Sequence, residues 1–438
     1  MDELMTPGIP ATMFAALAAG GGGPEAVRAL AAARYRKLAL MLWGVRRTAL
    51  REGIEADNAR LAVAGYDLLA AVQREQPEVA KAAIMYPSVG AWALRVLNSP
   101  DSDTAQPGAD PGRLSTVGAA AAVHAGLSTE IEVPVTGAAV MLPSLGAAGA
   151  DGHTAMVRIA DGHAEIVSAG RRTPVPADSH HDAPGWEGLH RVRVGSLDVL
   201  IDDLDPFRMP SSSELAPRLS AAERGKLIAV LQRAWPVLDA HHTEVAAEVR
   251  EAVKVIVPLI TTPGGLISSS TSATFGAVGL SEPPDPYACA VTLAHEVQHL
   301  KLTALLDTVS LTMPDDGSMY YAPWRDDPRP IGGLLQGAYA FLGVAGFWGR
   351  QRRHANGALR MQANVEFARW RAAAVRAVRT LLSSGKLTAP GQEFVTGMAH
   401  TLDMWESEPV PREALDLARD EAERHLRRWQ AAYGSLPA

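Results

Sequence analysis

The sequence predicts an α+β protein that is mostly helical, with a central, mainly antiparallel sheet. Long Ala- and Leu-rich segments near both ends of the chain repeat apolar residues at helical spacing. Short β-type runs, broken by Gly, Pro, Asp and His, occupy the middle of the chain. These runs are too short and too irregular for a doubly wound parallel sheet, which favours the mixed class.

The order of these segments predicts three regions: an N-terminal helical region over residues 1–112, a mixed α/β region with short strands over 113–217, and a helical domain over 218–438. In the first region we expect helices over 25–47, 54–74 and 89–98, followed by a turn-rich segment over 99–112. In the second we expect a helix over 114–127 and strands over 130–134, 138–142, 154–159, 163–167 and 192–201.

The third region begins with a helical pattern over 220–253, in which Ser220 and Glu223 have the spacing of a capping box. Strands are expected next, and Pro258 predicts that the first of them lies at a sheet edge, because proline cannot donate a ladder hydrogen bond. The expected strands cover 255–260, 265–269 and 273–280, and the expected helices cover 286–306, 333–353, 359–382 and 412–429.

The composition indicates a folded, soluble protein. Its 438 residues are 47% hydrophobic and 20% charged, and the net charge of −7 argues against a nucleic-acid partner. The single cysteine, Cys289, cannot form an internal disulfide, and the first ten residues carry two acids and no base, unlike a secretory signal. The uncharged run 255–281 contains Pro263 and two following glycines, so we expect no membrane span and a cytoplasmic location.

The motif that carries chemistry is His295-Glu296-Val297-Gln298-His299, an HExxH sequence inside a strong helical pattern. Residues at i and i+4 share one helix face, so both imidazoles can bind one metal ion. Zinc peptidases use this arrangement, with the glutamate as general base on a metal-bound water. We therefore expect a zincin-like HExxH helix with His295 and His299 as metal ligands. A coincidental pair of surface histidines is the alternative.

A third protein ligand is also needed. The next predicted helix has no acid or histidine before His354, and its inward polar residues are Gln336 and Tyr339. Gln336 is one candidate ligand, although an amide oxygen binds metals more weakly than a carboxylate. The other candidates are Asp326, Asp327 and Glu366.

The segment 320–330 carries two arginines, two acids and three aromatic residues. A guanidinium binds a carboxylate through two parallel hydrogen bonds, so Arg325 or Arg329 could hold an anionic cosubstrate or peptide side chain. In the alternative, the arginines pair with Asp326 and Asp327 and stiffen the loop. Another acidic cluster, at 202–205, suits a turn before Pro206, with a metal role as its alternative.

These segments resemble a known family: the HExxH-motif proteins of ribosomal peptide natural-product clusters, described as 2-oxoglutarate-dependent HExxH-type peptide β-hydroxylases. The resemblance covers most of the chain. The family commonly has histidine at the position of Gln336, and this chain departs there. The segments that carry the resemblance are 87–97, 130–137, 194–208, 271–285, 290–307 and 320–341, the last two being the most specific.

The resemblance implies a non-haem Fe(II) dioxygenase that consumes O2 and 2-oxoglutarate and hydroxylates a side-chain Cβ of a precursor peptide. His295, His299 and Gln336 would then hold the metal, with zinc as a substitute ion. Arg325, Arg329 and Lys301 become candidates for binding the distal carboxylate of the cosubstrate, and Lys301 suits this role least because it leaves the helix at another angle. Glu296 would orient a ligand or hold a water.

Three functions follow from this reading. The first is the peptide hydroxylase, with a radical-SAM maturase as a possible partner acting on the same peptide. The second is a zinc metallopeptidase that cleaves a peptide with HExxH. The third is a non-catalytic peptide-binding protein that keeps a degraded metal site.

Overall fold

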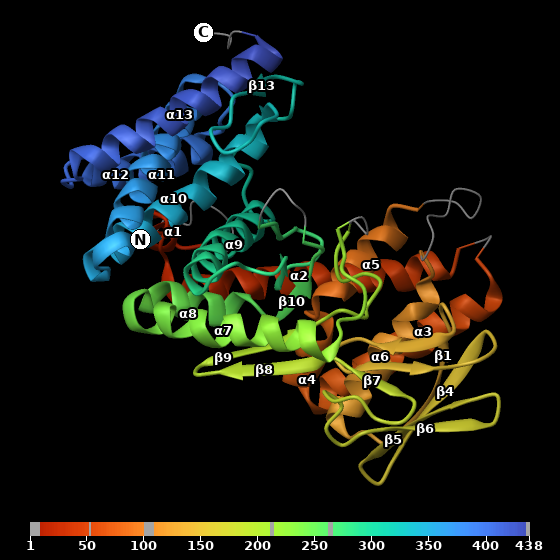
Figure 1. Cartoon of the computed structure of the whole chain (residues 1–438). Coiled ribbons are helices and arrows are strands. Elements are labelled where there is room, and N and C mark those ends of the chain that lie inside the picture. The colour runs from red at the N-terminus through yellow and green to blue at the C-terminus, as the bar shows by residue number, and fades with distance from the viewer. Residues whose placement is uncertain (1–8, 52–53, 100–108, 211–213, 262–265, 435–438) are drawn as a thin grey trace. The chain divides into compact units, whose positions relative to one another are not determined.

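The computed structural model describes residues 9–51, 54–99, 109–210, 214–261 and 266–434, so most of the expected turn segment 99–112 lies outside the described residues. The chain forms a mixed, mostly helical α/β structure with several antiparallel sheets (Figure 1). It divides into two compact units, and each is assembled from segments that are not consecutive in the sequence. Unit 1 comprises Met1–Ala33, Ala229–Ala252 and Pro283–Ala438, and unit 2 comprises Arg34–Ile228 and Val253–Glu282. This division differs from the three consecutive regions that the sequence predicts.

Unit 2 contains three of the sheets found among the described residues, where the sequence predicts one central sheet. Two are antiparallel, with strand orders β1-β4-β5-β6 and β2-β3-β7, and the third is mixed, with order β11-β12-β10-β9-β8. The strands are β1 (Thr129–Pro134), β2 (Ala139–Leu142), β3 (Gly146–Gly149), β4 (Thr154–Ala160), β5 (His163–Ser168), β6 (Arg171–Val175), β7 (Trp186–Gly188), β8 (His190–Val194), β9 (Leu197–Ile201), β10 (Val255–Pro258), β11 (Ser268–Ser269) and β12 (Ala277–Leu280).

The mixed sheet corrects two strand predictions. β10 pairs in parallel with both β9 and β12, so the expected edge position is wrong. Pro258 is tolerated because β9 pairs only with Val255 and Ile256, which leaves no ladder bond for the proline to donate. The single strand expected over 192–201 is a hairpin instead, because Gly195 adopts a φ of +54° between β8 and β9.

Two helices of unit 2, α3 (Ala56–Glu75) and α6 (Leu114–Ala125), pack closely against each other through glycines. A Cβ on Gly65 of α3 would lie 2.4 Å from the backbone of Leu114, and one on Gly118 of α6 would lie 2.5 Å from the Gly65 carbonyl oxygen. Only glycine allows this separation of the two helices. The helical elements are α3 (Ala56–Glu75), α4 (Pro77–Ile84), α5 (Pro87–Leu97), a 3₁₀ turn (Pro111–Arg113) and α6 (Leu114–Ala125).

Two long helices continue from one unit into the other: α2 (Gly23–Ala49) and α7 (Ala221–His241). The predicted capping box begins α7, where the Ser220 N–H donates to Glu223 Oε2 at 2.9 Å and the Glu223 N–H donates to Ser220 Oγ at 3.3 Å. The helix expected over 220–253 is interrupted at His242 and continues as α8 (Thr243–Ala252).

Unit 1 is a helical bundle in which α10 to α13 pack together (Figure 1). Its HExxH helix, α9, starts where the sequence predicts, because Asp285 accepts hydrogen bonds from the backbone N–H groups of Tyr287 and Ala288 at 2.8 and 2.9 Å. The elements are α1 (Ala11–Ala18), α9 (Pro286–Leu306), β13 (Met319–Tyr320), β14 (Arg329–Pro330), α10 (Ile331–His354), α11 (Gly357–Ser383), α12 (Ala389–Glu406) and α13 (Arg412–Tyr433).

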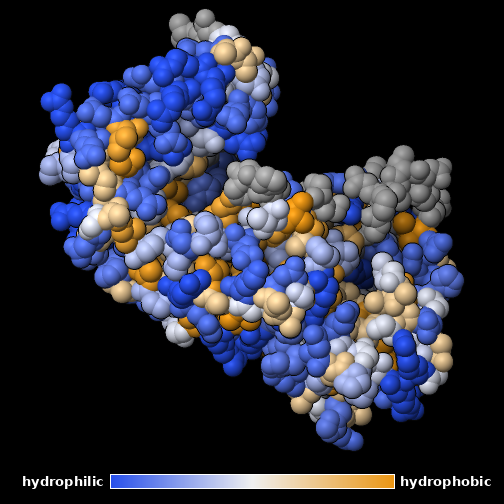
Figure 2. Space-filling view, in the orientation of Figure 1, coloured by the Kyte–Doolittle hydropathy of each residue, from blue (hydrophilic) through white to orange (hydrophobic). Residues whose placement is uncertain are grey.

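The helices of unit 1 differ in polarity. Figure 2 shows mainly hydrophilic side chains on the visible surface over α12 and α13. In contrast, α10 is long and apolar enough to meet the length and composition criteria for a membrane span, and 67% of its most apolar window is buried inside the protein. Core helices of folded proteins meet the same criteria, so α10 is adequately explained as the central helix of this bundle.

Candidate metal centre

The two motif histidines lie side by side on α9. His295 Nε2 and His299 Nε2 are 3.1 Å apart, and both rings are half-buried, with 19% of the His295 side chain exposed. Burial, together with neighbouring His299, holds the pKa of His295 well below its usual range. The ring is therefore neutral near pH 7, which is the form that binds metals.

The spacing of these nitrogens fits a shared metal ion. Imidazole nitrogens bind zinc at about 2.0–2.1 Å, so two of them at an angle between about 90° and 109° lie about 2.8–3.4 Å apart. The separation of 3.1 Å between His295 and His299 falls within this range. The separation is therefore compatible with one ion shared by both rings, and it equally allows a hydrogen bond between them.

Gln336 of α10 contacts the other side of the His299 ring. Its Oε1 lies 3.1 Å from Nδ1 of His299, and because this oxygen can only accept, Nδ1 donates. The proton on Nδ1 leaves the lone pair on Nε2, which is the nitrogen that faces His295. The sequence predicts Gln336 as one candidate for a third ligand, and in the structure its Oε1 bonds to the His299 nitrogen opposite the one that faces His295.

The other three candidate ligands have partners elsewhere. Asp326 is largely exposed, with Oδ1 3.7 Å from Nε2 of His425, and Asp327 lies between two arginines. Glu366 accepts from the Trp370 indole N–H at 2.7 Å, and burial raises the pKa of its carboxyl. Within the described ranges, no three His, Cys, Asp or Glu side chains gather as a possible metal site.

Glu296 is the carboxylate that approaches the histidine pair. Its side chain is buried, and Oε1 lies 4.0 Å from His295 Nε2. This distance is too long for a hydrogen bond between the two groups. It leaves the carboxylate beside the ring nitrogen of His295.

Lys301 is removed from the candidate site. Its ammonium is 1% exposed and bonds to Glu248 Oε2 at 2.7 Å and to the carbonyl oxygens of Gly20 and Gly21 at 3.2 and 3.0 Å. An ammonium has three protons, and all three have acceptors here. The sequence-based expectation that Lys301 could bind a cosubstrate carboxylate is therefore wrong, because the side chain is a buried structural cation.

The two loop arginines share one aspartate. Arg325 Nε donates to Asp327 Oδ1 at 2.9 Å, and Arg329 Nε lies 3.6 Å from Asp327 Oδ2. These contacts agree with the alternative in which the arginines pair with loop aspartates and stiffen the loop. The arginine side chains remain 50% and 34% exposed, so their other N–H groups stay open to solvent.

An aromatic cluster next to His295 was not foreseen from the sequence. The Phe341 ring meets the His295 ring edge-on at 5.0 Å between centroids, and Trp324 and Trp370 lie 4.8 and 4.3 Å from Phe341. Trp324 belongs to the aromatic-rich loop, and a Cβ on Gly337 would lie 2.3 Å from its ring. In the sequence, Gly337 was the available signal of this cluster, because a residue without a side chain gives the Trp324 ring room to reach α10.

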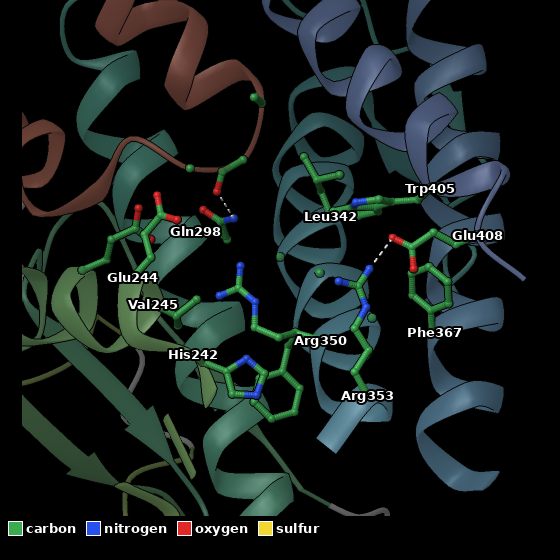
Figure 3. Close-up of a pocket in the computed structure, with 18 residues that line it drawn as sticks. His242, Glu244, Val245, Gln298, Leu342, Arg350, Arg353, Phe367, Trp405 and Glu408 are labelled. Atoms are coloured by element: carbon green, nitrogen blue, oxygen red, sulfur yellow. Dashed lines mark hydrogen bonds and ion pairs between the residues drawn. The ribbon is translucent and has the colours of Figure 1, made fainter. Parts of the chain in front are cut away.

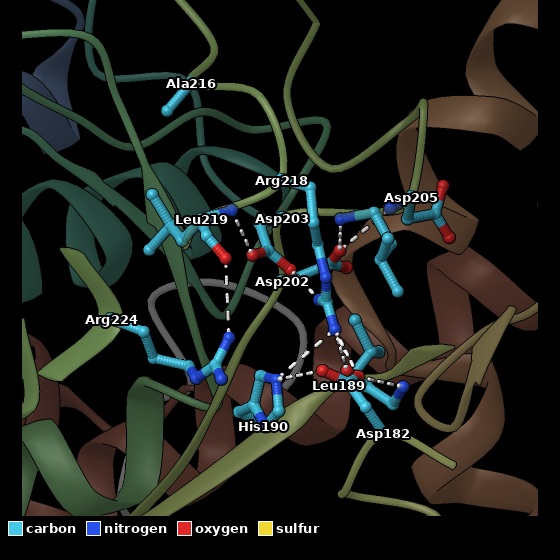
Figure 4. Close-up of polar contacts among 12 residues, drawn as sticks. Asp182, Leu189, His190, Asp202, Asp203, Asp205, Ala216, Arg218, Leu219 and Arg224 are labelled. Atoms are coloured by element: carbon cyan, nitrogen blue, oxygen red, sulfur yellow. Dashed lines mark hydrogen bonds and ion pairs between the residues drawn. The ribbon is translucent and has the colours of Figure 1, made fainter. Parts of the chain in front are cut away.

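The acidic turn at 202–205 has a structural role (Figure 4). Asp202, Asp203 and Asp205 are all buried. Asp203 pairs with Arg218, and Asp205 Oδ2 accepts from Arg113 at 2.7 Å. Because these carboxylates are closed off by protein partners, the structure favours the turn over the metal alternative.

Comparison of the chain with models of known protein families and with curated proteins finds no match.

Proposed function

We propose that this protein is a non-haem Fe(II)- and 2-oxoglutarate-dependent dioxygenase that β-hydroxylates a residue of a ribosomally made precursor peptide. The observation that carries the proposal is the pair of Nε2 atoms, 3.1 Å apart, with the opposite nitrogen of His299 bonded to Gln336. This arrangement prepares two neutral imidazoles for one divalent ion. The choice of iron and 2-oxoglutarate rests on the family resemblance.

Each residue of the centre has a distinct part in this proposal. His295 and His299 hold the metal, α9 serves as the zincin-like helix, and Gln336 keeps the His299 ring in its binding tautomer. Bound Fe(II) supplies the activation of O2 for C–H hydroxylation. Glu296 holds a water or a peptide N–H next to His295, at a site reached from solvent because His295 and His299 are half-buried. A cytoplasmic location and a radical-SAM maturase working on the same peptide belong to the proposal.

The test incubates the Fe(II)-loaded protein, 2-oxoglutarate and O2 with a short precursor peptide sought among the genes that neighbour its own. We expect a mass gain of about 16 Da, one succinate per product and an intact backbone. Omitting O2 or 2-oxoglutarate should abolish the gain. An unmodified peptide under the complete conditions, with iron bound, would contradict the proposal.

The exposed N–H groups of Arg325 and Arg329 support them as candidates for the distal carboxylate of 2-oxoglutarate. In this role, one Arg→Ala variant would raise the 2-oxoglutarate concentration needed by at least about 30-fold while keeping its iron. Unchanged requirements in both variants would leave the arginines with their structural contact to Asp327.

The position of Glu296 favours one alternative, a zinc metallopeptidase. A carboxylate 4.0 Å from the His295 nitrogen suits a general base acting on a metal-bound water. Cleavage by the zinc-loaded protein without O2 or 2-oxoglutarate would establish this function. Glu296→Gln would then abolish cleavage, whereas a hydroxylase should keep part of its activity in the same variant.

A further inference from the structure

Unit 1 contains a pocket that is lined by neither His295 nor His299. The cavity has a volume of about 260 Å³, and Figure 3 shows side chains entering it from several helices. Its walls come from α8, α9, α10, α11 and α12 and from the backbone of Gly20 and Gly21. This volume suits a molecule of roughly ten non-hydrogen atoms, well below drug size.

Two opposite charges in this pocket have no protein partner. Within the described residues, Arg350 and Glu244 make no ion pair or hydrogen bond through their side chains, and both are exposed to solvent. In Figure 3 the Arg350 guanidinium extends from α10 toward the side on which Glu244 and Gln298 lie. A ligand between them would meet one open cation and one open anion.

The remaining charged and titratable groups of the pocket are already paired. Glu248 bonds to Lys301 at 2.7 Å, Arg353 bonds to Glu408 at 2.8 Å, and His242 Nε2 lies 3.0 Å from Gln351 Oε1. The pKa of His242 is lowered by burial to about 4, so its ring is neutral near pH 7. Arg350 and Glu244 therefore set the charge pattern that a ligand meets.

Gln298 of α9 supplies an independent sign of a ligand. The residue is 4% exposed, its Nε2 donates to the Gly20 carbonyl oxygen at 2.8 Å, and its Oε1 has no hydrogen-bond partner. Buried side-chain oxygens almost always accept a hydrogen bond. Oε1 is itself covered by protein, so a donor bound in this pocket reaches it when the Gln298 amide turns toward the cavity. Gly343 leaves room for this side chain, since a Cβ there would lie 2.6 Å from Gln298 Cγ.

We propose that this pocket binds a free α-amino acid with an apolar side chain. Its ammonium group matches Glu244 and Gln298 Oε1, and its carboxylate matches the two-pronged guanidinium of Arg350. The side chain would lie against Leu342, Phe347 and Trp405. A simple anion is opposed by Glu244 and a simple cation by Arg350, which is why the charge pattern selects a zwitterion.

The test is calorimetric titration of L-leucine into the metal-free full chain, so it depends on neither the proposed metal nor an activity. We expect saturable one-to-one binding. Arg350→Gln and Glu244→Gln should each weaken it by at least about 10-fold. Because both side chains are exposed, these variants should fold, and thermal unfolding verifies this. The matched controls are Arg360→Gln on α11 and Glu413→Gln on α13, both exposed and outside the pocket, which should bind leucine like the wild type.

Two leucine fragments test the need for both charges. 4-Methylpentanoate lacks the ammonium group and 3-methylbutylamine lacks the carboxylate, so each should bind at least about 10-fold more weakly than leucine. The proposal is overturned if L-leucine, L-valine and L-phenylalanine all fail to bind at about 10 mM. It is equally overturned if either fragment binds as tightly as leucine, or if both pocket variants bind leucine like the wild type.

Discussion

At the scale of single residues, the proposed metal centre depends on the two α9 histidines. In His295→Ala or His299→Ala, one imidazole remains where two now lie 3.1 Å apart. We expect each variant to lose stoichiometric metal binding, measured by elemental analysis after dialysis. His400→Ala, an exposed histidine on α12, should bind metal like the wild type. Stoichiometric metal binding by both motif variants would contradict a metal centre on α9.

A second residue-scale prediction concerns Asp202. Burial and the neighbouring Asp205 carboxylate raise the pKa of Asp202 to about 7. The Asp202 oxygens meet the Tyr86 hydroxyl at 2.6 Å and the Asp205 N–H at 2.9 Å. Because the folded pKa is raised, the stabilising effect of the protonated form is complete below the unfolded pKa of 3.8 and is lost as the pH rises through about 7.

Asp202→Asn keeps the shape of the protonated acid and cannot ionise. We expect its melting temperature to match the wild type near pH 3 and to exceed it by several degrees at pH 8. Asp198→Asn is the matched control, because its hydrogen bond to Arg191 lowers the pKa of Asp198, and that variant should gain nothing at pH 8. Equal melting temperatures of Asp202→Asn and the wild type across this range would show that Asp202 is ionised in the folded protein.

At the scale of elements, the contact of the 320–330 loop with α10 depends on one glycine. A Cβ on Gly337 would lie 2.3 Å from the Trp324 ring, so Gly337→Ala should displace the tryptophan and lower the free energy of unfolding by about 1–3 kcal/mol. Gly332→Ala on the same helix has nothing within 4 Å of its added Cβ and should be neutral or stabilising by up to about 1 kcal/mol. Denaturant unfolding and Trp fluorescence measure both effects, and equal stability of the two variants would contradict this packing.

At the scale of the molecule, a buried ion pair joins distant segments of unit 1. Lys301 on α9 bonds to Glu248 on α8 and to the backbone of Gly20 and Gly21. Burial lowers the pKa of Lys301 and raises that of Glu248, so desolvation outweighs the attraction within the pair. Removing one partner should therefore lower the free energy of unfolding more than replacing both partners with apolar residues.

Lys301→Met should lower the free energy of unfolding by about 3–5 kcal/mol, because it leaves Glu248 buried without its cation. The double variant Lys301→Met/Glu248→Leu should recover part of this loss. Lys386→Met, which breaks the exposed pair with Asp316, should lower the free energy of unfolding far less than Lys301→Met, because solvent screens an exposed pair. A double variant no more stable than Lys301→Met, measured by denaturant unfolding, would contradict the predicted coupling.

Short-range patterns in the sequence predicted much of the secondary structure and part of the candidate site. The cap at Asp285 and the box at Ser220 and Glu223 mark helix starts through neighbouring atoms only. The i, i+4 spacing placed His295 and His299 on one face of α9 for the same reason. The helix α12 was missed although it has a local signal, since Thr388 Oγ1 accepts from the Gly391 N–H at its start. The short strand β3, of glycine and alanine alone, carries no comparable signal.

What the sequence by itself determined is therefore local: the α9 helix, the capping box at the start of α7 and the placement of the two motif histidines on one helix face. Only the tertiary structure decided that Pro258 ends an interior strand and that Gln336 bonds to Nδ1 of His299. It also decided that Lys301 forms a buried ion pair with Glu248. Each of these depends on which distant segment lies alongside. Helical periodicity and capping act over a few residues, whereas burial and the satisfaction of buried polar groups depend on partners up to hundreds of residues away.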